Sequence, residues 1–96
     1  MSERKNIDKG LIAVGNLLMD KRKALGKQYS SREKFITLRA EEYFDNNPWI
    51  SMRHLANIEE GKNWISIPML VYLATALEEE PTTLFNEMIV TYKKNK

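Results

Sequence analysis

The chain has 96 residues, of which 43% are hydrophobic, and this length accommodates one compact domain with a core of its own. The absence of cysteine excludes disulfide scaffolds, thiolate metal sites and cysteine nucleophiles. The formal net charge of +2 is too small to indicate a nucleic-acid partner from composition. Apolar runs fall far short of the ~20 residues of a membrane span, and residues 1–10 are too charged for a secretory signal, so we expect a cytoplasmic protein that does not bind membranes.

The first part of the chain divides into a polar arm and an amphipathic helix. Residues 1–10 are mostly polar and lack apolar periodicity, so a flexible N-terminal arm is expected there. Residues 11–25 have helical spacing, and Gly26 is expected to end this helix. Its apolar positions are Leu11, Val14, Leu17, Leu18 and Leu25. Basic residues 21–23 fall in its last turns, where they suit the helix dipole, and phosphate binding is an alternative role for them.

A capping box predicts the start of a second helix. Ser30 is expected to accept a backbone N–H of the first turn while Glu33 reaches back, and the helix should continue to about Phe44. Its expected buried stripe consists of Ile36, Ala40, Tyr43 and Phe44. The run Asp-Asn-Asn-Pro at 45–48 then favours a turn.

The stretch 51–61 reads as a short third helix with both ends marked. Ser51 can cap its N-terminus, and Gly61 can take the left-handed conformation that ends it. Ile50 and Leu55 have the spacing of a hydrophobic staple. Leu55, Ile58 and Glu59 share one face of this helix, and Arg53, Ala56, Asn57 and Glu60 share the other. One face is therefore expected to join the core and the other to face a partner.

Two more helices are predicted, at 66–77 and 81–92, each with a proline in or near its first turn. The fourth helix has a core stripe of Ile67, Leu70, Val71, Ala74 and Leu77. A second apolar stripe of Met69, Tyr72, Leu73 and Ala76 indicates burial on several sides or contact with another subunit. Residues 93–96 are expected to fray. The fold class is therefore all-α, with five helices in one domain over 11–92.

Nothing in the sequence indicates an enzyme. His54 is the single histidine, so no transition-metal ligand set is recognisable, and no glycine-rich loop for a nucleotide follows a strand. Glu59 and Glu60 point to different sides of a helix and form no acid–base pair. We expect no cofactor and no metal.

The outer face of the third helix carries the positive signal for function. Arginine binds guanine edges through two hydrogen bonds and asparagine binds adenine in the same way, and a short helix fits the major groove. Arg53 and Asn57 lie one helical turn apart on that face. On these two residues alone, an ordinary solvated face is the more common explanation.

The spacing from Ile50 to Phe85 resembles the Cro/C1-type helix-turn-helix repressors, the XRE family. The residues that carry the resemblance are Ile50, Ser51, Leu55, Ile58, Glu59, Gly61, Lys62, Ser66, Leu70, Leu73, Ala74, Ala76, Leu77, Leu84 and Phe85. Upstream, 22–26 and 31–36 resemble parts of the family's first two helices. The chain departs from the family in the extra length at 37–49, which implies an elongated second helix and an enlarged turn. The implied architecture is a five-helix lambda-repressor-like domain.

The resemblance also implies roles for individual residues. Base contacts are implied for Met52, Arg53 and Asn57, with core packing as the alternative for Met52. Contacts to the DNA backbone are implied for Ser31, Arg32, Ser51, His54, Lys62 and Asn63. Arg22 is implied to form a salt bridge with Glu59 that holds the third helix against the first. Trp49 and Trp64 bracket the third helix, and we expect both to pack under it, with base stacking as the less favoured role.

The hypothesis that follows is a transcriptional regulator, most simply a repressor that occludes a promoter. It would bind a double-stranded DNA operator as a homodimer, through the helices at 66–77 and 81–92, on two half-sites about one helical turn apart. A protein-interaction module, such as an adaptor or anti-repressor, is the alternative, since the net charge is small and Glu60 lies on the outer face. An antitoxin on the same fold, which binds both DNA and a toxin, is a third possibility.

Overall fold

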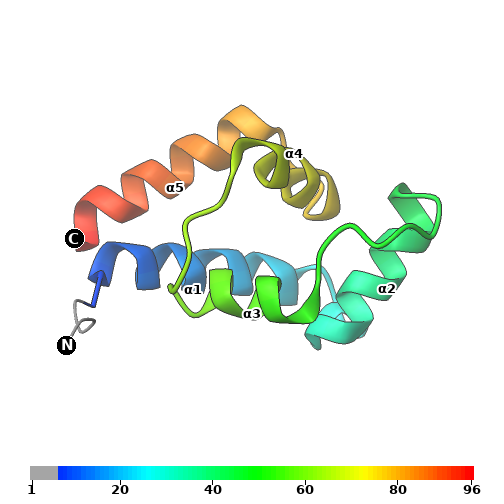
Figure 1. The fold of residues 1–96 in the computed structure, drawn as a ribbon. Helices are drawn as coiled ribbons and strands as arrows, with labels where there is room; N and C mark the ends of the chain where they lie inside the picture. The colour runs from blue at the N-terminus through cyan, green and yellow to red at the C-terminus, as the bar shows by residue number, and fades with distance from the viewer. Residues whose placement is uncertain (1–6) are drawn as a thin grey trace.

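The computed structural model describes residues 7–96, so residues 1–6 of the expected N-terminal arm lie outside the described residues. Its elements are α1 (Lys9–Ala24), a 3-10 turn η2 (Lys27–Tyr29), α2 (Arg32–Tyr43), α3 (Met52–Glu59), α4 (Ile67–Ala76) and α5 (Pro81–Asn95) (Figure 1). Between residues 7 and 96 the chain contains no strand. The predicted all-α class with five helices is therefore confirmed.

Four of the helices begin at a side-chain cap. Ser31, Ser51 and Ser66 each accept the backbone N–H three residues later, at 3.0–3.2 Å, and Asp8 does the same for α1. The prediction that Ser30 caps the second helix is wrong by one residue. The Ser30 hydroxyl donates to the carbonyl oxygen of Lys27 at 2.8 Å instead, because η2 occupies the residues just before it.

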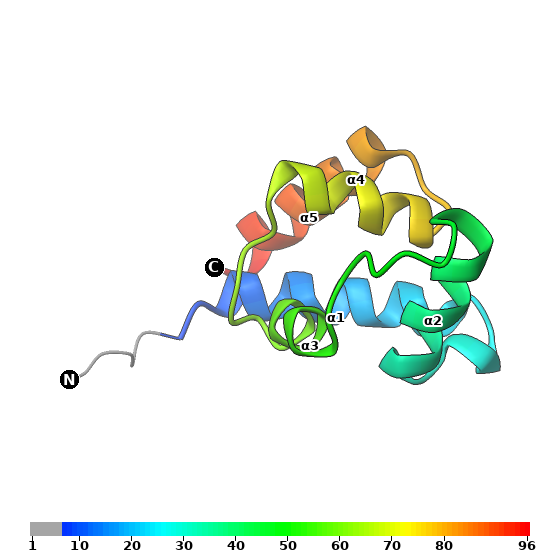
Figure 2. The same ribbon diagram turned by 45° about the vertical axis from the view of Figure 1, so that its right-hand side comes forward.

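The long helices α1 and α5 run side by side in opposite directions, as Figures 1 and 2 show. At the end where α1 begins, a Cβ atom added at Gly10 would lie 2.7 Å from the Tyr92 ring. The Tyr92 hydroxyl donates a hydrogen bond to Asp8 at 3.0 Å. This hydrogen bond raises the pKa of the Tyr92 hydroxyl above its ordinary value. Two helix ends are extended relative to the sequence prediction, since α1 begins at Lys9 and α5 continues to Asn95.

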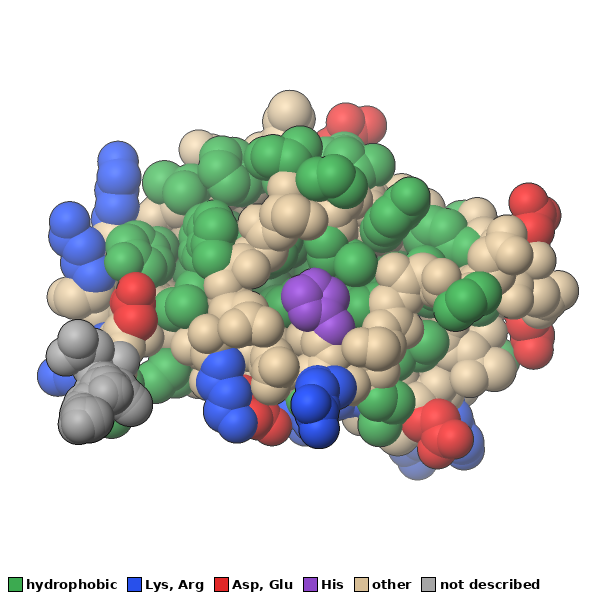
Figure 3. All heavy atoms as spheres, in the orientation of Figure 1, with side chains coloured by type: hydrophobic (Ala, Val, Ile, Leu, Met, Phe, Trp, Pro, Cys, Tyr) green, Lys and Arg blue, Asp and Glu red, His purple; other side chains and the backbone are tan. Residues whose placement is uncertain are grey.

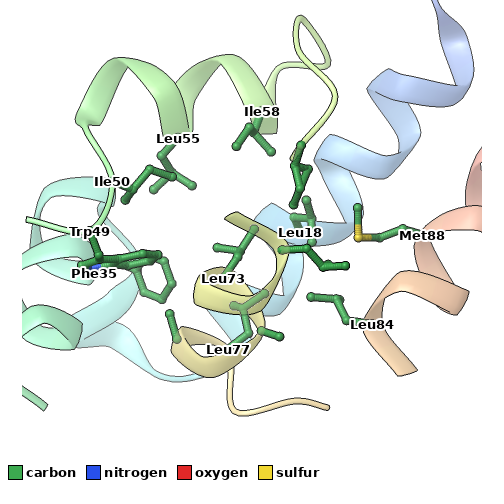
Figure 4. Packing of buried hydrophobic residues seen from close by; sticks show 14 of the residues in the cluster. Leu18, Phe35, Trp49, Ile50, Leu55, Ile58, Leu73, Leu77, Leu84 and Met88 are labelled. Atoms are coloured by element: carbon green, nitrogen blue, oxygen red, sulfur yellow. The ribbon is translucent and has the colours of Figure 1, made fainter. Parts of the chain in front are cut away.

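All five α-helices contribute to one core (Figure 4). The largest fully buried side chains are Leu18, Phe35, Leu55, Leu73, Leu84 and Met88. Burial of apolar side chains of this size stabilises a fold by about 1.5–3 kcal/mol each. Across the described residues, no helix is both long and apolar enough to cross a membrane.

The buried face of α2 differs from the predicted stripe. Tyr43 is 47% exposed, whereas Phe35, Arg39 and Ala40 are buried. The prediction for Tyr43 was wrong because the helix is rotated so that the Arg39 stem occupies an interior position. The elongation implied for 37–49 is divided between α2, which ends at Tyr43, and an irregular connection to Ser51.

The two tryptophans have different environments. Trp49 is buried, donates its indole N–H to the carbonyl oxygen of Ile36 at 3.1 Å and stacks on Phe44. Trp64 is 43% exposed and packs edge-on against Tyr92, with ring centroids 5.8 Å apart. The expectation that Trp64 packs under the third helix as core is therefore wrong, because the connection after α3 carries it towards α5.

The exposed side of α4 also differs from expectation. Leu73 and Ala76, which belong to the stripe proposed for another subunit, are buried in this chain. The exposed large hydrophobic residues of α4 are Ile67 at 65%, Val71 at 44% and Tyr72 at 45%. The prediction that Ile67 and Val71 belong to the core stripe is therefore wrong, because α4 is oriented so that both lie at the surface, next to α5.

Candidate nucleic-acid interface

The helix α3 lies unusually close to α1. A Cβ atom added at Gly15 would lie 2.4 Å from the carbonyl oxygen of Glu59, and one added at Gly61 would lie 2.6 Å from the Cα atom of Ile12. Gly61 also has a φ of 76°, which disfavours other residues. Two glycines thus let the backbone of α3 rest on α1, with Leu55 and Ile58 turned into the core.

The implied ion pair between Arg22 and Glu59 is present and is buried on both sides. Nε and Nη2 of Arg22 donate to the two carboxylate oxygens of Glu59 at 2.8 and 2.9 Å. Nη1 of Arg22 donates to the carbonyl oxygens of Tyr29 and Ser30 at 2.9 and 2.6 Å. Every nitrogen of the Arg22 guanidinium and both oxygens of the Glu59 carboxylate are therefore hydrogen-bonded, which is the condition under which a buried charge is tolerated. This pair joins α3, α1 and the η2 turn.

Arg32 shares the same carboxylate. Its Nε donates to Oε1 of Glu59 at 2.8 Å, and its Nη2 lies 3.8 Å from Glu60. The N-terminus of α2 consequently lies beside the C-terminal turn of α3. Arg32 was implied to contact the DNA backbone, and here its guanidinium already has two carboxylate neighbours and a side chain 27% exposed.

The residues implied to contact bases lie on the outer face of α3 with different exposures. Met52 is 50% exposed and Arg53 is exposed, whereas Asn57 is half-buried. Among the described residues, no hydrogen bond or ion pair occupies the side chain of Arg53 or Asn57. Both side chains are therefore available to an external hydrogen-bonding partner.

The residues implied to contact phosphates surround this face. Ser31 and Ser51 are exposed caps at the N-termini of α2 and α3, and Lys62 and Asn63 are exposed just after α3. His54 is half-buried in the first turn of α3. Figure 3 shows the histidine near the centre of this view, with lysine and arginine side chains below it.

Glu60 reduces the positive character of this surface. Lys62 Nζ lies 3.2 Å from a Glu60 carboxylate oxygen, and both side chains are largely exposed. A surface ion pair of this kind contributes about 0–1 kcal/mol, so a phosphate could compete for Lys62. The sequence placed Glu60 on the outer face but did not indicate this pairing.

The basic cluster at the end of α1 has mainly structural partners. Lys21 Nζ lies 2.7 Å from Glu79 and 2.9 Å from Glu87, so it ties α1 to α5 and to the turn before it. Burial lowers the pKa of Lys21, but hydrogen bonds from its ammonium to Glu79 and Glu87 outweigh that effect and raise it above 10.5. With Arg22 bound to Glu59, two of the three basic residues at 21–23 are engaged in contacts within the protein.

An open apolar groove lies between α4 and α5. It encloses about 610 Å³ and is lined mainly by Ile67, Leu70, Val71, Phe85 and Ile89. Figures 1 and 2 place α4 and α5 on one side of α1 and α3 on the other. The groove is therefore separate from the outer face of α3.

Sequence reasoning missed the role of Gly15. A glycine inside a helix costs stability relative to alanine, and its position in the middle of α1 was a signal that another backbone approaches there.

Residues 7–96 contain no group of three or more histidine, aspartate or glutamate side chains placed to hold a metal ion. Comparison of the chain with protein-family models, curated proteins and solved structures found no match.

Proposed function

We propose that this protein is a sequence-specific DNA-binding transcriptional regulator of the Cro/C1 helix-turn-helix type, which reads the major groove with α3. The observation that carries the proposal is the two-sided construction of α3. Its inner face is fixed by Leu55, Ile58 and the buried Glu59, and its outer face presents Arg53 and Asn57, whose side chains have no hydrogen-bond or ion-pair partner within residues 7–96. Major-groove readout requires such a rigid helix with free polar side chains.

In this proposal the two polar side chains divide the readout. Arg53 donates two hydrogen bonds to O6 and N7 of a guanine. Asn57, one turn further along α3, forms two hydrogen bonds with N6 and N7 of an adenine. Met52, exposed beside them, offers apolar contact to a thymine methyl group. Each good two-bond contact contributes about 1–3 kcal/mol of discrimination between bases.

The surrounding polar groups would position the helix on the DNA backbone. The N-terminus of α3 at Ser51 presents backbone N–H groups, which attract a phosphate. Lys62 and Asn63 lie beyond its other end, and binding there would require Lys62 to exchange Glu60 for phosphate. Repression by occlusion of a promoter needs no further chemistry from the chain.

Dimerisation through α4 and α5 belongs to the same proposal. The groove between these helices and the exposed Ile67, Val71 and Val90 form an apolar surface on the side away from α3. A two-fold contact there would present two copies of α3 to successive half-sites. Sedimentation equilibrium should show a dimer that Val71→Asp dissociates, while a monomer at every concentration would contradict this part of the proposal.

Selection of bound duplexes from a random DNA pool tests the function directly. We expect enrichment of a short motif in two inverted copies, with affinity for it at least about 10³-fold above that for unrelated duplex at physiological salt. Recovery of unenriched DNA, or no retention of DNA at low salt, would contradict the proposal.

A protein-interaction module is the second candidate, and the pairing of Glu60 favours it. Glu60 lies within 3.2 Å of Lys62 and 3.8 Å of Arg32, so one carboxylate moderates two of the implied phosphate contacts. Glu60→Gln discriminates between the candidates. A DNA-binding protein should gain affinity when this charge is removed, whereas an adaptor without DNA affinity should gain none.

A further inference from the structure

A second polar surface lies where α2 and α4 both end. Arg39 Nη2 donates to Glu78 at 2.6 Å, which links α2 to the residue that follows the cap of α4. The Phe44 ring meets the edge of Tyr72 with ring centroids 5.8 Å apart. The C-termini of two helices therefore converge at this end of the molecule.

The charges at this end are opposite to those that would stabilise the helices. The C-terminus of a helix carries partial negative charge and favours cations, yet neither α2 nor α4 has a basic residue in its last turn. Glu41 and Glu42 occupy the end of α2, Asp45 follows it, and Glu78 follows α4. All four carboxylates are exposed, and Arg39 neutralises at most one of them. The resulting surface has a net negative charge.

Exposed aromatic rings accompany these carboxylates. Tyr43 is 47% and Tyr72 45% exposed, and a hollow of about 370 Å³ separates them, with Phe44, Asp45 and Trp49 in its wall. Exposed tyrosine faces attract cations, and most strongly the planar guanidinium of arginine. At its right-hand end, Figure 3 shows acidic and hydrophobic side chains next to each other.

Arg39, which approaches from the protein interior, already contacts both aromatic rings and carboxylates at this end of the molecule. Its guanidinium carbon lies 4.3 Å from the centroid of the Tyr29 ring and 5.2 Å from that of Tyr43, while its Nη atoms bind Glu42 and Glu78. An arginine arriving from solvent would find the same combination, since Tyr43 and Tyr72 have exposed ring surface and Asp45, between them, has no ion pair within residues 7–96.

The backbone around the hollow is held in a defined shape. Asp45 and Asn46 have φ angles of 54° and 63°, and the Asn46 N–H donates to the carbonyl oxygen of Ala40 at 2.8 Å. Trp49, buried beneath, is fixed by its hydrogen bond to Ile36. The tyrosines and carboxylates are thus presented by an ordered segment.

We propose that the acidic–tyrosine surface, formed by Glu42, Tyr43, Asp45, Tyr72 and Glu78, docks an arginine-rich segment of another protein. Charge complementarity selects this occupant, and the same charge repels DNA and RNA. The inference goes beyond the proposed DNA binding, because none of these residues belongs to α3 or to its surroundings. A regulator with this surface would bind DNA at one end and a basic protein segment at the other.

The test uses the full chain, labelled with ¹⁵N, and a short synthetic peptide of alternating arginine and serine. We expect the peptide to shift the amide signals of residues 41–47, 72 and 78 while the signals of α3 remain in place. A peptide with lysine in place of arginine should bind more weakly, and spermidine, which carries charge without a planar group, weaker still. Equal binding of all three, or shifts spread over other surfaces, would overturn the proposal.

Two single variants separate specific docking from general attraction to acidic protein. Asp45→Asn removes one charge in the wall of the hollow without breaking an ion pair between described residues, and should weaken the arginine peptide about threefold. The matched control is Asp20→Asn, which removes one exposed charge on α1 and should leave the affinity within about 1.5-fold of wild type. Equal losses in the two variants would overturn the proposal.

The rings are tested separately. Tyr72→Leu keeps an apolar side chain against Phe44 and should weaken the peptide about threefold, because one cation–π contact at an exposed site contributes about 0.5–1 kcal/mol. Unchanged circular dichroism is the check on folding, and Tyr43→Leu serves as a second variant if the first is unstable. Unchanged peptide affinity in the folded variants would overturn the assignment of the tyrosines. DNA affinity should be unaffected throughout, so this proposal can fail while the proposed function stands.

Discussion

Two arginines are buried among residues 7–96, and they are paired in different ways. Arg22 and Arg39 are 2% and 3% exposed. Every guanidinium nitrogen of Arg22 has a hydrogen-bond acceptor, and its partner Glu59 is as buried as the arginine itself. Arg39 binds Glu42 and Glu78, whose side chains are 43% and 54% exposed, and its Nε atom has no hydrogen-bond partner within residues 7–96.

The difference separates a closed ionic cluster from an open one. The pair of Arg22 with Glu59 excludes water and fixes α3 against α1, so loss of one partner leaves an unpaired charge inside the protein. The carboxylates that bind Arg39 can return to water, so the second cluster is adaptable and remains accessible to an outside cation. The first cluster holds the candidate DNA-binding helix, and the second lies under the acidic–tyrosine surface.

Loss of the Glu59 charge is expected to have the largest effect on stability. In Glu59→Gln the buried guanidinium of Arg22 loses its counter-charge, which should lower the free energy of unfolding by about 3 kcal/mol. Urea denaturation measures this value. The neighbouring Glu60→Gln, whose side chain is exposed, should stay within about 0.5 kcal/mol of wild type. Similar costs for both substitutions would contradict the closed cluster.

Disruption of the close approach between α1 and α3 is expected to have the next largest effect on stability. Gly15→Ala places a methyl group 2.4 Å from the carbonyl oxygen of Glu59, so the helices must separate, at a cost of about 2 kcal/mol. Asn16→Ala, on the exposed side of α1, is the control and should be neutral or slightly stabilising. A stability gain in Gly15→Ala would show that α3 is not held as described.

The open cluster should tolerate loss of its cation better than the closed one tolerates loss of its anion. Arg39→Met retains most of the apolar stem and leaves Glu42 and Glu78 in contact with water, so we expect a cost of about 1–2 kcal/mol in chemical denaturation. A cost equal to that of Glu59→Gln would remove the distinction between the two arginines.

The smallest expected effect concerns stability at alkaline pH. Burial and the hydrogen bond from its hydroxyl to Glu42 raise the pKa of Tyr29 above its ordinary value of 10.0. The protonated Tyr29 hydroxyl therefore contributes its full share to the free energy of unfolding below pH 10. This contribution is lost as the pH rises through the pKa of Tyr29 in the folded protein. Denaturation midpoints should fall more gently above pH 10 in Tyr29→Phe than in wild type, and parallel pH profiles would contradict this role.

Local signals accounted for most of what the sequence predicted correctly. Ser51 and Gly61 mark the ends of α3 through interactions within one helical turn, and the structure has both. The serine cap of α4 at Ser66 was equally local. The contact between Arg22 and Glu59 spans 37 residues and was expected only from the resemblance to a family.

The errors occurred where tertiary packing chooses between nearly equivalent residues. Ser30 and Ser31 are both good caps, and η2 decides between them. Tyr43 lost its expected interior position because Arg39 reaches Glu78, 39 residues away, and no local pattern indicates that partner. The position of Trp64 depended in the same way on where α5 lies.

The central claim is that the outer face of α3 reads DNA, and Arg53 tests it most directly. Fluorescence anisotropy on the selected duplex, over a range of salt concentrations, should show at least about a tenfold loss of affinity in Arg53→Ala. Arg53→Lys should lose much of the specificity while it keeps the salt dependence, and Lys94→Ala, an exposed cation on α5, should bind as wild type does. If Arg53→Ala and wild type bind the selected and unrelated duplexes equally at every salt concentration, α3 does not read DNA.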